Sequence, residues 1–207
     1  MAKGSRGGRR AGGAGLNPND ILSTRDMISE RHKNSLVDEV LTVSRDLQNE
    51  YGISAQVTNF EIAKLKSKAN AIAYYDGANI AVNEKFMKSD TINKAYDECV
   101  KQGFHPSKGN KTAMEAVASH EFGHAINDAI GRKMGLDIDS SATKIVNEAR
   151  KQTKHSGVVQ MASKISGYAT YSNAEAIAEA VSDCYCNGRK ARSESKAIVN
   201  VVKSYLN

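Results

Sequence analysis

Hydrophobic positions in the N-terminal quarter of the chain follow a mostly helical spacing. A helix-starting turn, Asn-Pro-Asn-Asp at residues 17–20, precedes this region, and Gly52 follows it. The apolar positions between them are Ile21, Leu22, Ile28, Leu36, Val37, Val40, Leu41 and Leu47. Residues three or four apart share one face of a helix, so this spacing predicts a long helix with a break near the polar residues 29–34.

The next segments carry the shorter patterns of strands. Residues 53–58 can form a short strand. Residues 71–75 and 78–83 flank the Asp-Gly pair at 76–77, a dipeptide that favours tight hairpin turns, and they therefore predict a β-hairpin. Residues 91–102 predict a helix, which a loop rich in glycine follows.

A third pattern marks a capped amphipathic helix after the middle of the chain. Thr112 and Glu115 have the spacing of a capping box, and Gly131 is expected to end the helix. Its apolar stripe comprises Met114, Val117, Ala118, Phe122, Ala125, Ile126 and Ala129. His120 and His124 point about 130° away from the centre of this stripe. We expect the stripe to pack in the core and the histidines to face a polar cleft.

Length and charge indicate one folded domain with a basic tail. The chain has 207 residues and a formal charge of +6. Four of its 29 basic residues, Lys3, Arg6, Arg9 and Arg10, lie in the first fifteen residues, which hold no acid, so the remainder is nearly neutral. We expect the Gly/Arg-rich residues 1–16 to be disordered and residues 17–207 to form the domain.

Composition also limits the partners and the compartment. Four tail charges neutralise few phosphates, so any binding of nucleic acid should be weak. The sequence has no signal segment and no run of membrane-spanning length, which predicts a protein without a membrane partner. Three cysteines, Cys99, Cys184 and Cys186, argue against a disulfide framework. We expect a cytoplasmic or virion-associated protein, with a non-classical release route left open.

The residues His120-Glu121-Phe122-Gly123-His124 carry the clearest chemistry. Histidines four apart lie on one helix face and can bind one zinc ion, while Glu121 stands beside the metal and can accept a proton from activated water. This is the chemistry of a metallopeptidase. Gly123 costs about 1 kcal/mol relative to alanine inside a helix, which the close approach of another segment would explain.

A third protein ligand must come from later in the chain. The segment that begins Ser172-Asn-Ala-Glu predicts a helix that places Glu175, Glu179 and Asp183 on one acidic face. Ser172 and Glu175 also have the spacing of a capping box, in which case Glu179 would be the ligand. The other glutamate would hydrogen-bond the remaining N–H of a ligand histidine. Asp183 and Asp128 are weaker candidates for that second role, and each is expected to be an ordinary solvated acid.

Two sequence blocks together resemble a known family. HEFGHAIND and the later SGYATYSNAEAIAEA are similar to the gluzincin metallopeptidases of the anthrax toxin lethal factor-like type, over about residues 71–183. In that family a tyrosine stands seven residues before the ligand glutamate, and a second glutamate follows four residues after it. The matching positions here are Tyr168, Glu175 and Glu179. Similar domains occur in secreted toxins and in proteins of phages and mobile elements.

The resemblance implies an α+β, mostly helical zincin-like fold with a small sheet or hairpin above the motif helix. It favours Glu175 as the third ligand and Glu179 as its hydrogen-bonding neighbour. It also implies that Tyr168 donates its hydroxyl to the oxyanion, with Tyr171 as the rival. This chain departs from the family in its alanine-rich glutamate helix and in lacking toxin-like accessory domains, which leaves the substrate and the delivery route open.

Other aromatic and histidine residues receive minor roles or none. A strand edge above the motif helix could bind an extended polypeptide by β-augmentation, with Tyr74 and Tyr75 lining the groove. His32, His105 and His155 are scattered without ligand spacing and receive no role.

The resulting hypothesis is a zinc endopeptidase with one zinc ion per chain and a polypeptide substrate. His120, His124 and Glu175 would bind the metal, Glu121 would be the general base and Tyr168 would stabilise the oxyanion. One alternative is a catalytically silent interaction protein of a phage or mobile element that keeps the metallopeptidase fold. Another is a nucleic-acid-associated protein that works through its basic tail. Sequence specifies neither the oligomeric state nor the cleavage site.

Overall fold

Four strands form one mixed sheet in the spatial order β1–β2–β4–β3. The computed structural model describes residues 16–53, 57, 59–67, 69 and 71–207. The strands are β1 Ile21–Asp26, β2 Asn59–Leu65, β3 Ala73–Tyr75 and β4 Asn79–Asn83. β2 pairs with β1 antiparallel and with β4 parallel. β3 pairs with β4 antiparallel and forms one edge of the sheet.

The predicted hairpin is confirmed as β3 and β4. Asp76 stabilises its turn, because one carboxylate oxygen accepts the backbone N–H groups of Ala78 and Asn79 at 2.9 and 2.7 Å. Gly77 has a φ of 100°, a conformation that residues with a Cβ rarely adopt. Local turn chemistry therefore explains this part of the fold.

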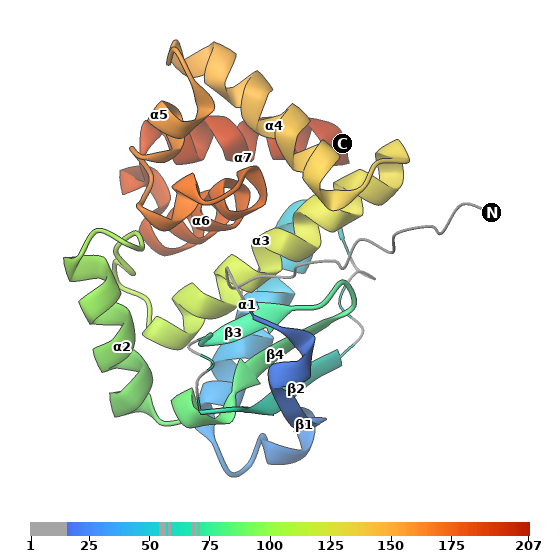
Figure 1. Ribbon diagram of the computed structural model, residues 1–207, viewed down its shortest axis with the longest axis vertical. Coiled ribbons are helices and arrows are strands. Elements are labelled where there is room, and N and C mark those ends of the chain that lie inside the picture. The colour runs from blue at the N-terminus through green and yellow to red at the C-terminus, as the bar shows by residue number, and fades with distance from the viewer. Residues whose placement is uncertain (1–15, 54–56, 58, 68, 70) are drawn as a thin grey trace.

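Seven α-helices are formed within the described residues. They are α1 Ser35–Tyr51, α2 Ser89–Lys101, α3 Ala113–Met134, α4 Ile138–Thr153, α5 Val158–Ala162, α6 Asn173–Asn187 and α7 Ser193–Leu206. Figure 1 shows α1 behind the sheet, and α3 crossing the middle of the molecule between the sheet and the group α4 to α7. The fold is thus α+β and mostly helical. No helix among the described residues has the length and apolarity needed to cross a bilayer.

The predicted first helix is wrong over its N-terminal half. Residues Ile21–Asp26 form the strand β1, and the helix α1 begins only at Ser35, after the N-cap Asn34. It ends as expected at Gly52, which is left-handed with a φ of 66°. The partner of β1 is β2, which lies more than thirty residues later in the chain. The spacing of apolar residues within 21–26 therefore could not reveal that this segment pairs as a strand.

Two further predictions fall largely outside the described residues. Of the predicted strand at 53–58, only Ile53 and Val57 are described, and the strand of this region, β2, begins at Asn59. Of the predicted tail at 1–16, only Leu16 is described. It packs on the outer face of the sheet, against the cluster of Ala63, Tyr74 and Ala81.

Helix α3 is buried around almost its whole circumference. The predicted apolar stripe lies in the core, but every other residue from Ala113 to Gly131 except Glu115 and Asp128 is buried as well. The reason is that α3 packs against β3 and α1 on one side and against α6 on another. The predicted end at Gly131 is wrong, because α3 continues to Met134 and Gly135 provides the left-handed cap. The helix that carries the histidines is the central element of the fold.

Candidate metal centre

Local sequence sets the start of α3 and hence the direction of its histidines. The predicted capping box is confirmed: the Thr112 hydroxyl accepts the Glu115 N–H at 3.1 Å, and the Glu115 carboxylate accepts the Thr112 N–H at 2.8 Å. One turn of helix separates His120 from His124, and their ring centroids lie 5.0 Å apart. Both side chains are buried. The pair therefore faces the interior and not bulk water.

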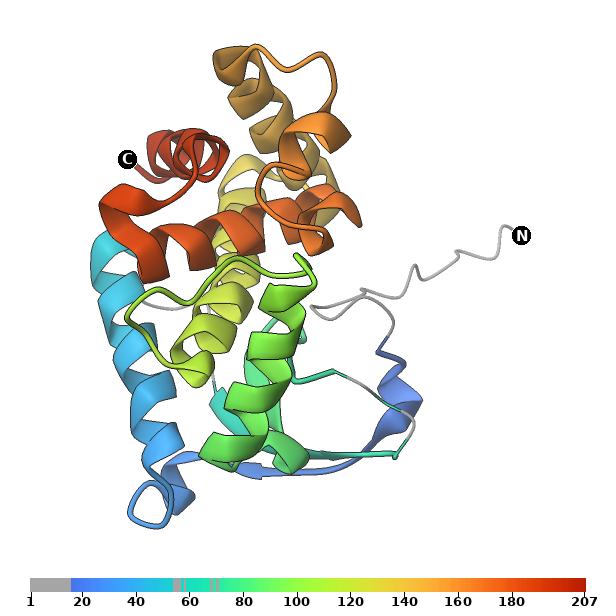
Figure 2. The ribbon, with the colours of Figure 1, turned by 90° about the vertical axis from the view of Figure 1, so that its left-hand side faces the viewer.

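Helix α6 crosses α3 at unusually short range beside these histidines. A Cβ on Gly123 would lie 2.6 Å from the Cα of Ala178, so only glycine fits at this point of α3. One turn away, the Ser119 hydroxyl donates to the Ser182 hydroxyl at 3.2 Å, and Ser182 donates to the Ala116 carbonyl at 3.0 Å. Small residues on both helices thus bring the acidic face of α6 to the histidine pair, as the position of Gly123 suggested. Figure 2 shows the crossing from the side.

The Glu175 carboxylate faces both histidines. Its Oε2 atom lies 3.2 Å from Nε2 of His120 and 3.3 Å from Nε2 of His124. Ser172 caps α6 by accepting the Glu175 N–H at 3.1 Å, but the Glu175 side chain is directed to the histidines instead of back to Ser172. Glu175 therefore has both predicted contacts through different atoms: its backbone N–H is capped by Ser172, and its carboxylate faces the histidines.

These three side chains form a buried group that can hold a metal ion. Their ligand atoms all lie within 4.8 Å of one another. Two atoms bound to zinc in a tetrahedral arrangement would lie about 3.3 Å apart, close to the observed separations. Among the described residues, the buried polar atoms without a hydrogen-bond partner are Oε2 of Glu121, Nε2 of His124 and Oε2 of Glu175. A cation among them would satisfy lone pairs that otherwise face one another, so the residues fit a metal.

Glu179 lies behind His120 and accepts three hydrogen bonds. Its Oε1 atom is 2.7 Å from Nδ1 of His120 and 2.9 Å from Nδ1 of His105, and its Oε2 atom accepts the Ser166 hydroxyl at 2.7 Å. An ionised carboxylate only accepts, so Nδ1 of His120 carries the proton and Nε2 keeps its lone pair for a ligand. Glu179 thus occupies the position predicted for the glutamate that orients a ligand histidine.

The electrostatics of the cluster favour a positive charge among the carboxylates. Burial alone would raise the pKa values of Glu175 and Glu179, but the neighbouring histidines lower both, and that of Glu179 falls to about 2. Burial would lower the pKa of His120, yet its contacts with Glu175 and Glu179 raise it well above the ordinary value. Burial raises the pKa of Glu121, and the charges of His120 and His124 offset only part of this rise. A proton or a metal ion between His120 and Glu175 would supply a positive charge next to the carboxylates of Glu175 and Glu179.

Tyr168 lies directly against His120 of the histidine pair. It begins a short 3-10 turn, Tyr168–Thr170, and its ring stacks on that of His120 with centroids 5.6 Å apart and an interplanar angle of 20°. The rival Tyr171 is one ring further out, 5.4 Å from Tyr168, and is 61% exposed. Of the two predicted candidates, the structure brings Tyr168 against a ligand histidine and leaves Tyr171 at the rim.

A cavity of about 500 Å³ opens onto this cluster. His120, Glu121 and Glu179 line it, together with residues 71–73, which lead into β3. Its aromatic lining comes from Tyr96 of α2, Phe104 of the following loop, and the turn at 168–171. The predicted groove residues Tyr74 and Tyr75 do not line it, because both are packed: Tyr74 lies on the outer face of the sheet, and Tyr75 donates to Asp128 at 2.9 Å. Within the described lining, Ala71, Ile72 and Ala73 form the strand side of the cavity.

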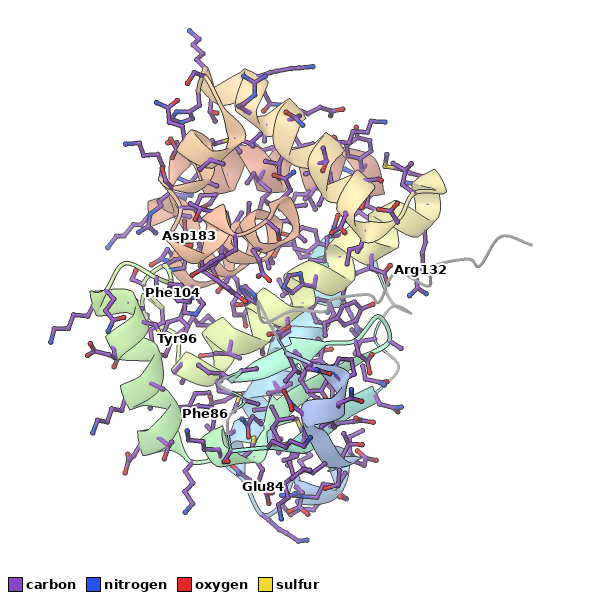
Figure 3. All side chains as sticks on the ribbon, in the orientation of Figure 1. Glu84, Phe86, Tyr96, Phe104, Arg132 and Asp183 are labelled. Carbon is purple, nitrogen blue, oxygen red and sulfur yellow. The ribbon has the colours of Figure 1, made fainter. Side chains whose placement is uncertain are left out.

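The two weaker acidic candidates serve other parts of the fold. Asp183 is 1% exposed and accepts the Ser195 hydroxyl and the Arg192 N–H at 2.6 and 2.9 Å, which connects α6 to the start of α7. Asp128 accepts Tyr75 and also Arg132, at 2.6 Å, and Arg132 donates on to the Gly77 carbonyl at 2.7 Å. Figure 3 places Asp183 by α6 and Arg132 near the far end of α3. Neither acid is the solvated side chain that the sequence suggested.

His105 belongs to the site, although it received no role from the sequence. It lies in the loop before α3, lines the cavity and contacts Glu179. It has no fixed spacing to the other histidines, so no motif reveals it. Its neighbours Gly103 and Pro106 marked only a loop. His155 instead pairs with Glu194 at 2.9 Å, at the start of α7.

Comparison with known proteins gives no family for this chain. No protein-family model, no curated protein and no solved structure matches it. The chemistry of the site must therefore be argued from its own residues.

Proposed function

We propose that this protein is a zinc-dependent endopeptidase of the gluzincin type. The observation that carries the proposal is the buried convergence of His120, His124 and Glu175, with Glu121 beside it at the floor of a cavity. Two imidazoles and one carboxylate are the protein ligands that catalytic zinc sites use when one position stays open for water or substrate. A resemblance to lethal factor-like peptidases in two sequence blocks supports the same assignment.

The donor set favours zinc over the other common metals. Imidazole nitrogen suits zinc and the later transition metals, whereas magnesium and calcium prefer sites built of oxygen. Zinc held by these residues would polarise the scissile carbonyl and lower the pKa of water near it. We expect one zinc ion per chain.

Glu121 is placed to act as the general base. It follows His120 directly on α3, is buried and lines the cavity. Its pKa is raised by burial, which brings the carboxylate closer to the proton affinity that the abstraction requires. It would take a proton from the attacking water and pass it to the leaving amine.

Tyr168 is the proposed donor to the oxyanion. Its ring is fixed by stacking on His120 and by Phe104, at a centroid distance of 4.9 Å. A preorganised hydroxyl donor at a developing negative charge stabilises the transition state more than the ground state.

The cavity suits a polypeptide segment of neutral or basic character. Its described lining contains the acids Asp20, Glu121 and Glu179 and no lysine or arginine. The edge strand β3 pairs with β4 alone among the described strands, and an added peptide strand would pair with its other edge. We propose that the substrate enters along this edge.

The test combines metal analysis with peptide cleavage. Purified protein should contain stoichiometric zinc and should cleave a peptide library in a chelator-sensitive manner. Glu121→Gln keeps the side-chain volume and the metal ligands, so zinc should stay bound while kcat/KM falls by about 10²-fold or more. Glu98→Gln, at an exposed position of α2, is the matched control and should leave cleavage unchanged.

Two results would contradict the proposal. The first is a purified protein that binds no stoichiometric zinc when the metal is supplied. The second is cleavage that persists in Glu121→Gln. Stoichiometric zinc without cleavage of any peptide would instead favour the interaction-protein alternative.

A further inference from the structure

His105 links the cavity wall to the residues behind the metal ligands. Its Nδ1 atom is 2.9 Å from Oε1 of Glu179, the same oxygen that is 2.7 Å from Nδ1 of His120. One carboxylate oxygen therefore serves two imidazoles, one from α3 and one from the loop before it. The proposed reaction assigns no task to the second imidazole.

Backbone hydrogen bonds join the loop that carries His105 to the segment that carries Tyr168. The Gly167 N–H donates to the Gly103 carbonyl at 2.8 Å, and the Tyr168 N–H donates to the Phe104 carbonyl at 3.0 Å. Gly103 has a φ of 72°, which lets the chain turn out of α2 into this pairing. The two segments that border the histidine pair are thus held in fixed register.

Hydrogen bonds also hold the C-terminal end of this loop, at residues 106–107. The Tyr96 hydroxyl donates to the Pro106 carbonyl at 3.1 Å, and the Asn187 amide donates to the Ser107 carbonyl at 2.7 Å. The first contact comes from α2 and the second from the end of α6. His105 therefore lies on a segment that neighbouring elements hold on both sides.

Aromatic contacts fix the ring of His105 in one orientation. It stacks on Tyr96 with centroids 5.4 Å apart and an interplanar angle of 4°, and it meets the edges of Phe104 and Tyr168 at 5.1 and 5.2 Å. Figure 3 shows Tyr96 and Phe104 on the same side of the molecule, at α2 and the loop after it. Because these contacts fix the His105 ring, its Nδ1–H can donate in only one direction, and Glu179 lies in that direction.

The Glu179 carboxylate accepts hydrogen bonds from three donors on three different segments. They are His120 on α3, His105 on the loop, and Ser166 before the Tyr168 turn, at 2.7, 2.9 and 2.7 Å. A glutamate side chain has three rotatable torsions, so one hydrogen bond alone would leave its orientation loosely defined. Polar groups that hold a metal ligand in place affect both metal affinity and activity.

We propose that His105 is a positioning residue: its Nδ1–H fixes Glu179, and through Glu179 the orientation of the ligand His120. This role rests on the proposed metallopeptidase function, because it concerns the ligands of that site. It makes the site a unit of residues from the loop at 103–107, α3 and α6. It does not require His105 to touch the substrate.

Substitutions at this position separate the hydrogen bond from the packing. His105→Asn carries an amide N–H near the place of Nδ1 and can still donate to Glu179. His105→Gln carries its amide near the place of Nε2, and His105→Leu keeps volume without any donor. Ser166→Ala removes a different donor to the same carboxylate, together with the acceptor of the Ala169 N–H at 3.0 Å, and leaves the His105 side chain unchanged.

The experiment measures the zinc dissociation constant by chelator competition, together with kcat, KM and the melting temperature of the metal-free protein. We expect His105→Leu and His105→Gln to raise the zinc dissociation constant about 10-fold and to lower kcat, with KM nearly unchanged. His105→Asn should restore most of both losses. Ser166→Ala should weaken zinc binding in the same direction, and the double variant should lose less than the sum of the two effects.

Other outcomes would overturn the inference. Equal zinc affinity in wild type and His105→Leu would show that Glu179 does not need this donor. Equal losses in His105→Asn and His105→Leu would reduce His105 to packing, and a rise in KM alone would make it a substrate contact. A wild-type protein that binds zinc and cleaves peptide while these variants behave normally refutes this role alone. A wild type without zinc refutes the proposed function as well.

Discussion

The Cα atom of Ala178 lies 2.6 Å from the point that a Cβ on Gly123 would occupy. This contact sets how closely α6 approaches α3 and therefore where Glu175 meets the histidines. Ala178 follows from the same requirement, because a larger side chain at this crossing would force the two helices apart. One alanine of the alanine-rich α6, a departure from the resembling family, thus has a packing reason here.

Gly123→Ala should destabilise the protein and weaken the metal site together. The new methyl group would meet backbone, which cannot rotate away, at a cost of about 1–3 kcal/mol. This exceeds the gain of about 1 kcal/mol that alanine brings inside a helix. Denaturant unfolding and zinc titration measure the two effects. Gly157→Ala is the control, because nothing lies within 4 Å of its added Cβ, and it should change stability by less than about 0.5 kcal/mol. Wild-type behaviour of Gly123→Ala would show that the helices can separate freely.

Glu175 and Glu179 should differ sharply in their effect on metal binding. Glu175→Gln replaces the carboxylate oxygen that faces both histidines, so stoichiometric zinc binding should be lost. Glu179→Gln alters a residue behind His120, so zinc should still bind, with an affinity about 10- to 100-fold lower. Zinc titration of the two variants side by side gives the comparison. The reverse ranking would exchange the two roles.

Tyr168→Phe should lower kcat without removing the metal. The ring would keep its stacking on His120, and only the hydroxyl would be lost. Loss of one donor to a developing oxyanion typically reduces kcat about 10²- to 10³-fold. Tyr171→Phe serves as the matched variant at the exposed rim, where we expect little change in kcat. A large loss of kcat in Tyr171→Phe alone would assign the oxyanion contact to that residue.

The metal-free protein should be most stable at mildly acidic pH. The pKa of Glu179 is about 2 in the folded state, below its ordinary 4.5, so its contribution is complete above pH 4.5 and is lost as the pH falls towards 2. The pKa of His120 is raised above its ordinary 6.5, so its contribution is complete below pH 6.5 and is lost as the pH rises through the folded value. These groups together favour the window between pH 4.5 and 6.5.

Thermal unfolding of chelator-treated protein across the acidic and neutral range measures this dependence. Glu179→Gln has no titrating carboxyl at this position and should flatten the acidic limb of the profile. Zinc should shift the stable range to higher pH, because it takes the place of the proton on His120. An acidic limb equally steep in Glu179→Gln would assign that limb to other carboxylates.

Sequence predicted the parts of the site that depend on neighbours along the chain. The capping box at Thr112, the histidine spacing and the capped start of α6 are all local, and each is present as expected. The contact of Glu175 with the histidines needed a close helix crossing, which Gly123 hinted at but did not prove.

Sequence missed the parts that arise from contacts between distant segments. His105 and Ser166 meet at Glu179 only because the loop before α3 pairs with the turn at 167–168. The same limitation explains β1, which periodicity assigned to a helix although its hydrogen bonds come from β2. Residue propensity and spacing describe a single segment, whereas the Glu179 contacts and the β1–β2 pairing each depend on two segments that are distant in the sequence.

The bonds of Asp128 join the edge hairpin to the helix of the histidines. Tyr75 of β3 and Arg132 of α3 both donate to its carboxylate, and Arg132 also donates to the hairpin turn at Gly77. A peptide added to the edge of β3 would thus rest on a strand that is braced against α3 itself. Under the proposed function, a misaligned peptide would displace the hairpin and, through these bonds, the helix of the histidines, so the register of docking would affect the geometry of the candidate metal ligands.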